Sequence, residues 1–156
     1  MRGSAEVVKM LNEVLVGELT AINQYFLAAK IAGHRGYGHL GEKLYKESVG
    51  EMRHAEKLID RILYLDGLPN VQKLEKVKIA EGVVEQLGAD LEVERRSVER
   101  LNTGIELARQ HGDNGSATLL EELLGGAERH VNWLETQLEL SKKLGEPHYL
   151  AQQVRD

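Results

Sequence analysis

Apolar residues return every three or four positions along four long segments of the chain, which is the spacing of one buried face of an α-helix. The predicted helices cover about residues 5–33, 39–65, 83–111 and 117–144 of the sequence. The two prolines, Pro69 and Pro147, both fall outside these segments, where they interrupt no helix. Four helices of this length in a chain of 156 residues predict one all-α domain, residues 1–156, built as a four-helix bundle.

Two of the predicted helices are preceded by a residue that often caps the N-terminus of a helix. Ser4 and Ser116 are the predicted N-caps of the first and fourth helices. The connection over residues 66–82 is long for neighbouring helices. It is therefore predicted to run the length of the bundle as a crossover, which makes the second and third helices parallel. Near the end of the chain, Glu146 and Pro147 predict a short fifth helix, because proline is favoured at the first helical position.

Composition removes several classes of function. The chain has no cysteine, so it can form neither a disulfide framework nor a zinc-thiolate site. Its net charge of −5 argues mildly against nucleic-acid binding, which usually needs a basic surface. No uninterrupted apolar run approaches the roughly 20 residues that span a bilayer, and the first four residues do not begin a secretion signal. We expect a cytoplasmic protein that binds neither nucleic acid nor membranes.

Ionisable residues interrupt all four apolar stripes near the midpoints of the predicted helices. They are Glu18 on the first helix, Glu51 and His54 on the second, Glu94 on the third and His130 on the fourth. Midpoints of packed helices of similar length lie at about the same level, whichever way the helices run. Because such helices pack roughly 8–10 Å apart, these five side chains are predicted to meet at the bundle axis.

Three buried carboxylates without compensation would cost several kcal/mol each, and divalent cations would offset that cost. Glu51 and His54 form a Glu-x-x-His pair on one helix face, an arrangement that ferritin-like di-iron proteins use. Carboxylate and imidazole donors together suit iron or manganese. A single glutamate or histidine in an apolar stripe is usually a boundary residue or a hydrogen-bonded core residue. Joint placement on four stripes favours a metal centre.

Four blocks of sequence carry a resemblance to a known family. The blocks are residues 17–27 (GELTAINQYFL), 51–56 (EMRHAE), 66–70 (DGLPN) and 133–138 (WLETQL). No single block is specific, but in combination they make the chain resemble the bacterioferritins over nearly its whole length.

The resemblance implies a ferritin-like hollow shell of 24 subunits that takes up Fe(II), oxidises it with dioxygen or peroxide and stores ferric mineral. It also implies that the family's iron-ligand positions are taken by Glu18, Glu51, His54, Glu94 and His130. Glu51 would bridge the two irons, and Tyr25 matches a family tyrosine near them. Met52 matches the family's haem ligand, so haem b is expected at a twofold interface between subunits, each of which supplies one thioether. Met52 is one residue from Glu51, about 100° around the helix, and is predicted to face outward.

The chain departs from the family at Ala127. The pattern requires a second Glu-x-x-His on the fourth helix, but Ala127 stands three residues before His130. Glu128 is two positions from His130, roughly 200° around the helix, and is predicted to point away. The missing carboxylate would bridge the two metals. We therefore expect weaker iron binding on the Glu94 and His130 side and slower oxidation, unless five ligands and water suffice.

Two functions from different classes follow. The first is an iron-storing ferroxidase that uses the five retained ligands. The second is a haem-carrying shell subunit with impaired ferroxidase activity, which co-assembles with a ligand-complete second bacterioferritin subunit. Ala127 favours the second function, and the five ligands favour the first. A DNA-protecting mini-ferritin is a weaker alternative, because those proteins usually bind metal between subunits and lack the fifth helix.

Overall fold

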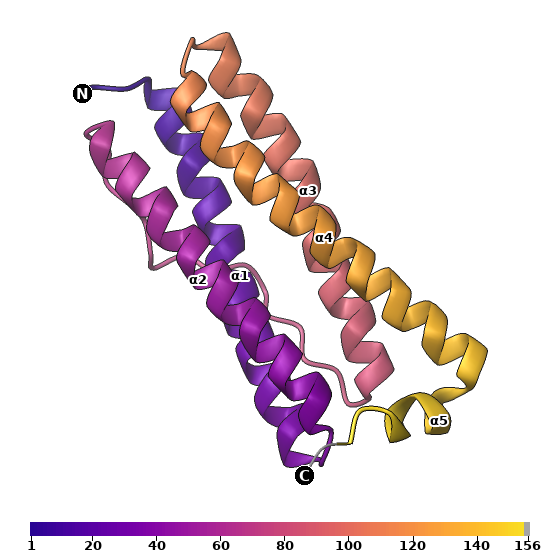
Figure 1. Ribbon diagram of the computed structural model, residues 1–156. Helices are drawn as coiled ribbons and strands as arrows, with labels where there is room; N and C mark the ends of the chain where they lie inside the picture. Colours follow the sequence, from indigo (N-terminus) through magenta and orange to yellow (C-terminus); the bar gives the residue numbers. More distant parts are fainter. Residues whose placement is uncertain (155–156) are drawn as a thin grey trace.

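The computed structural model describes residues 1–154, and all regular secondary structure in that part of the chain is helical. The helices are α1 (Ala5–His34), α2 (Gly38–Tyr64), α3 (Val83–Gln110), α4 (Asn114–Leu144) and α5 (Glu146–Ala151). α1 packs antiparallel to α2, and α3 packs antiparallel to α4 (Figure 1). The predicted four-helix bundle with a short fifth helix is confirmed. None of the helices in residues 1–154 is long and apolar enough to cross a membrane.

The segment between α2 and α3 is the predicted crossover, and α2 and α3 run in the same direction (Figure 1). It is held along α1 by side chains that bond its backbone. The Asn12 amide accepts a hydrogen bond from Asn70 N at 2.7 Å, and Thr20 Oγ1 accepts one from Glu75 N at 2.9 Å. Further along, Gln24 Oε1 accepts from Lys78 N at 3.0 Å. These bonds satisfy backbone groups that the extended segment cannot pair with itself.

The observed N-cap of α1 is the predicted one, whereas the observed N-cap of α4 is not. Ser4 caps α1 as predicted, since its hydroxyl accepts from Glu6 N at 3.2 Å. The prediction of Ser116 as the N-cap of α4 is wrong, because the helix begins earlier and Asp113 is the cap. The Asp113 carboxylate accepts from Ser116 N at 3.0 Å and from Arg61 Nη2 at 2.6 Å. The bond from α2 fixes Asp113 in the capping position.

Most of the core lies in two apolar clusters, one toward each end of the bundle, and a small third cluster consists of Ala21, Tyr25 and Val93. The first joins the N-terminal half of α1 to the C-terminal halves of α2 and α3 and to the N-terminal half of α4. The second surrounds Leu40, Leu44 and Leu87 and is closed by Tyr149 of α5, whose hydroxyl donates to Gln137 Oε1 at 2.8 Å. The predicted ionisable residues occupy the level between these clusters, in agreement with the midpoint argument.

One apolar residue with the spacing of a core position lies outside the core. Phe26 fits the apolar spacing of α1, but its side chain is 46% exposed. It lies at the margin of the stripe and contacts Tyr45 of α2, with ring centroids 6.1 Å apart. This contact is on the outer surface of the α1–α2 pair.

Candidate metal centre

The five predicted ligands come from four helices and lie in the middle of the bundle. Four of them are buried, and His54 is half-buried. The helical spacing that turns their stripes inward also turns these side chains inward.

The first group of donors joins α1 to α2. Glu18, Glu51 and His54 each offer a ligand atom, and the three atoms lie within 4.8 Å of one another. Nδ1 of His54 is 3.3 Å from Oε2 of Glu51 and 3.7 Å from Oε2 of Glu18. The sequence of α4 makes room for this imidazole, because a Cβ at Gly126 would lie 3.2 Å from Cε1 of His54.

The second group joins α3 to α4. Nδ1 of His130 lies 3.0 Å from Oε1 of Glu94, and the Tyr25 hydroxyl donates to the same Glu94 oxygen at 2.6 Å. The Tyr25 ring meets the His130 ring edge-on, with centroids 5.1 Å apart. Glu94 therefore contacts His130 and Tyr25. It is not one of the carboxylates whose oxygens lie within 4.8 Å of the Glu18, Glu51 and His54 ligand atoms.

Burial leaves this level of the bundle short of positive charge. Burial raises the pKa of the Glu18 carboxyl, and the neighbouring Glu94 raises it further against the opposing effect of His54. The pKa of Tyr25 also lies well above its ordinary value because of burial and then of Glu94, so its hydroxyl keeps its proton. Oε2 of Glu18 and Nε2 of His130 are buried without a hydrogen-bond partner. Buried carboxylate oxygens and imidazole nitrogens without hydrogen-bond partners are suitable ligand atoms for divalent iron or manganese.

A second buried carboxylate lies one turn before Glu94 on α3. Asp90 is 0% exposed, and its Oδ1 accepts from Gln24 Nε2 at 2.8 Å and from Gln86 Nε2 at 2.9 Å. Burial raises the pKa of Asp90 from 3.8 to about 6, although the two amide bonds oppose the rise. The same glutamines bond the crossover backbone, so Asp90 links the crossover to the level of the donors.

Position 127 contributes no donor to either group. Ala127 is 4% exposed and belongs to the first apolar cluster. Glu128 is exposed, in agreement with its predicted direction away from the axis. α4 therefore presents only His130 to this level of the bundle.

Sequence reasoning missed a glutamate that the structure brings to His130. Glu47, Glu51 and His130 form a second set of donor atoms that lie within 4.8 Å of one another. Oε2 of Glu47 is 3.6 Å from Nδ1 of His130. The available signal was its position four residues before Glu51, which places both carboxylates on one face of α2.

Met52 faces outward from α2, away from the bundle axis. Its side chain is 51% exposed, whereas the neighbouring Glu51 is 7% exposed. Tyr45 is seven residues earlier on the same helix and is also half-exposed, so the two share one outward face. The predicted outward direction of Met52 is confirmed.

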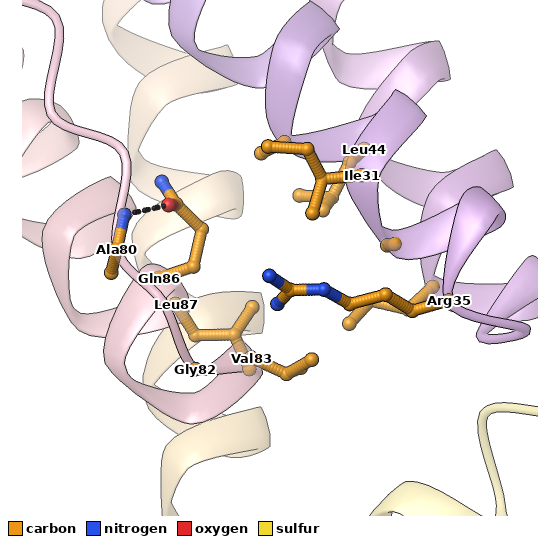
Figure 2. Close-up of a pocket in the computed structure, with 11 residues that line it drawn as sticks. Ile31, Arg35, Leu44, Ala80, Gly82, Val83, Gln86 and Leu87 are labelled. Atoms are coloured by element: carbon orange, nitrogen blue, oxygen red, sulfur yellow. Dashed lines mark hydrogen bonds between the residues drawn. The ribbon is translucent and has the colours of Figure 1, made fainter.

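An apolar pocket near one end of the bundle is separate from these donors. It is enclosed by the last turns of α1, the first turns of α2 and α3 and the end of the crossover (Figure 2). The Arg35 side chain extends across it, and Gln86 Oε1 accepts from Ala80 N at 2.7 Å (Figure 2). Arg35 also donates to Glu81 O at 2.5 Å. These bonds attach the crossover to the bundle, and none of the predicted ligands lines the pocket.

Known proteins resemble the chain over nearly its full length. The Ferritin family model, described as a ferritin-like domain, matches residues 8–144. The bacterioferritin of Streptomyces coelicolor is 51% identical over 97% of this chain and 90% of its own length. Bacterioferritin BfrA of Mycobacterium tuberculosis is 48% identical over 99% of this chain and 97% of its own length. A solved structure of the M. tuberculosis BfrA superposes with a TM-score of 0.98, covering 99% of this chain and 98% of that one.

Proposed function

This chain belongs to the bacterioferritin family, so it is a subunit of an iron-storage shell, and we propose that it oxidises Fe(II) at a di-iron centre inside its own bundle. The proposed ligands are Glu18, Glu51, His54, Glu94 and His130. Fe(II) is the substrate of the reaction and the cargo of the shell.

The convergence of buried carboxylates and imidazoles between two apolar clusters carries this proposal. Glu18 and Glu94 are 4% and 1% exposed, and Oε2 of Glu18 has no hydrogen-bond partner. A purely structural role would leave such a group paired, because an unsatisfied buried polar group costs about 1–3 kcal/mol. Cations bound at this level would supply the missing partners.

The chain's own residues position and separate two metal ions. Glu51 is the proposed bridging ligand. It belongs both to the set with Glu18 and His54 and to the set that includes His130, which supports this role. Tyr25 orients Glu94 through its short hydrogen bond and, with its raised pKa, donates rather than accepts. Each pair of Fe(II) ions that becomes Fe(III) gives up two electrons, and dioxygen or hydrogen peroxide accepts them together with two protons.

We further propose that 24 copies form the shell and that Met52 binds haem b at a twofold interface. The half-exposed thioether on the outward face of α2 supports this role, because a thioether is an accepted axial ligand of haem iron. Bound haem would supply one-electron chemistry, and the chain's part is to present Met52 from each of two subunits.

The alternative of a haem-carrying shell subunit that depends on a partner chain for iron oxidation is not favoured. Its support was Ala127 alone, whereas all five other donors are retained and converge. Relatives at 47–51% identity over nearly the whole chain are bacterioferritins.

Aerobic oxidation of two Fe(II) per subunit by the purified shell tests the proposed function. The natural protein should show a fast phase in the absorbance of ferric product, and Glu94→Gln should slow that phase by at least about tenfold, because it removes a charged ligand. Glu128→Gln is the control, since it makes the same chemical change on the exposed face of α4. Oxidation by the natural protein at the rate of protein-free buffer would contradict a ferroxidase function.

A further inference from the structure

Glu47 brings a carboxylate to His130, whose own helix provides none at position 127. It precedes Glu51 by one helical turn on α2, and its Oε2 is 3.6 Å from Nδ1 of His130 on α4. Its side chain is 23% exposed, so most of it is inside the bundle. The Glu47, Glu51 and His130 donor atoms lie within 4.8 Å of one another, a separation that one cation could span.

We infer that Glu47 is the fourth carboxylate of the di-iron centre and that it replaces, from α2, the ligand that Ala127 cannot provide from α4. The inference rests on the proposed function, because it completes that centre. It assigns one ion to the Glu18, Glu51 and His54 side. It assigns the other ion to Glu47, Glu94 and His130, with Glu51 shared between the two sides.

Charge supports this assignment. Two divalent cations carry four positive charges. The three carboxylates Glu18, Glu51 and Glu94 carry three negative charges, so one positive charge would remain unbalanced in a buried place. Ferritin-like di-iron proteins balance it with a Glu from each of two helices and one from each of two Glu-x-x-His pairs. With Ala127 in one of those pairs, Glu47 restores the count of four.

The neighbours of Glu47 leave one oxygen directed at the centre. Oε1 of Glu47 lies 2.9 Å from Lys43 Nζ, and Lys43 Nζ is also 5.2 Å from the centroid of the Trp133 ring. Trp133 stacks in turn on His130, with centroids 6.0 Å apart and planes 28° apart. Lys43 thus holds Oε1 on the outer side, and Oε2 faces His130.

A second observation points to a ligand at this level. Nε2 of His130 and Oε2 of Glu18 are buried without a hydrogen-bond partner, one in each of the two donor sets. The sets share Glu51, so the orphaned atoms belong to one continuous cluster. His130 is 2% exposed, and its Nδ1 faces carboxylate oxygens of both Glu47 and Glu94.

Anaerobic titration of the metal-free shell with Co(II) tests the inference without any oxidation step. Cobalt binds imidazole and carboxylate donors, and its absorbance reports the number and strength of the sites. The natural protein should bind two Co(II) per subunit. Glu47→Gln should weaken the second site by at least about tenfold, because it removes a ligand charge. Glu47→Gln combined with Ala127→Glu should recover the second site.

Two controls separate ligation from folding. Glu56→Gln makes the same change at an exposed position of α2 and should bind as the natural protein does. Lys43→Gln removes the ion pair of Glu47 but no proposed ligand, and it should retain two sites. Glu47→Gln with the same two affinities as Glu56→Gln would overturn the inference and leave the proposed function intact. No Co(II) binding by the natural protein would overturn the di-iron centre itself.

Discussion

The hydroxyl of Tyr25 donates a 2.6 Å hydrogen bond to Oε1 of Glu94, and this bond joins α1 to α3 in the middle of the bundle. The same Glu94 oxygen lies 3.0 Å from Nδ1 of His130, so one carboxylate contacts side chains of two other helices. The bond keeps Glu94 facing the bundle axis before any ion binds. Preorganisation of this kind lowers the entropy that metal binding has to overcome.

Replacement of Tyr25 by phenylalanine should destabilise the metal-free shell. The change leaves a buried carboxylate oxygen with one bond fewer, at a cost of roughly 1–3 kcal/mol, or roughly 2–12 °C in apparent Tm. Calorimetry of the metal-free protein measures it. Tyr37→Phe removes a hydroxyl away from the centre and should shift the Tm far less. Equal shifts in the two variants would show that the Tyr25–Glu94 bond adds no specific stability.

The buried carboxyl of Asp90 should make stability depend on pH. In the folded chain Asp90 keeps its proton up to about pH 6, whereas the unfolded chain loses it at about 3.8. Between these values the folded state binds more protons, so the contribution of this group to stability falls as pH rises and stays low above about pH 6. The difference corresponds to about 3 kcal/mol.

Asp90→Asn isolates this effect, because Asn keeps an oxygen that can accept from Gln24 and Gln86 but cannot ionise. The Tm of the variant minus that of the natural protein should increase from pH 4 to about pH 6 and then level off. Because other titrating groups are common to both proteins, their effects cancel in this difference. A Tm difference that does not change with pH would contradict the assignment.

The sequence predicted the helices and the level of the centre because both depend on periodicity. It did not predict Glu47, since an ionisable residue at the margin of a stripe resembles any solvated position until α4 packs against it. The sequence also did not predict the N-cap of α4. Asp113 and Ser116 are both good capping residues, and Arg61 on α2 donates to both of them. The helix begins at Asn114 because the Asp113 carboxylate accepts from the backbone N and the hydroxyl of Ser116. Phe26 has the spacing of a core residue, but it lies at the margin of the stripe and packs on Tyr45 at the outer surface of the bundle.

Haem titration tests the role of Met52. The metal-free shell should bind one haem per two subunits, with a Soret band typical of thioether ligation, and Met52→Leu should abolish that band while leaving the shell assembled. Met10→Leu is the control, because it exchanges the same side chain at a position that is 6% exposed in the core. Retention of the Soret band in Met52→Leu would show that another residue ligates the haem.

Introduction of a glutamate at Ala127 measures how complete the natural centre is. If Glu47 supplies the fourth carboxylate, Ala127→Glu should change the fast phase of Fe(II) oxidation by less than about threefold, well below the effect of losing a ligand. Ala127→Gln has nearly the same volume without the charge, so it reports the effect of overpacking the apolar cluster around Ala127. A large acceleration in Ala127→Glu but not in Ala127→Gln would mean that the natural centre lacks a ligand.

Two adjacent glycines of α4 should respond differently to alanine. A Cβ at Gly125 would meet only Arg129 Nη1, at 3.5 Å, which is ordinary contact, whereas a Cβ at Gly126 would lie 3.2 Å from Cε1 of His54. Gly125→Ala should stabilise the metal-free protein by up to about 1 kcal/mol, because alanine is the better helix former. Gly126→Ala has the same helical advantage but displaces the imidazole of His54.

The Co(II) affinity of the Glu18, Glu51 and His54 site should therefore fall about tenfold in Gly126→Ala and stay unchanged in Gly125→Ala, since the orientation of a ligand is as important as its presence. Calorimetry of both metal-free variants shows whether either change disturbs the fold. Equal Co(II) affinities in two folded variants would mean that His54 can shift without loss of binding. Gly126 would then serve only the packing of α4, whereas a selective loss would identify it as the position that sets the His54 ring for metal.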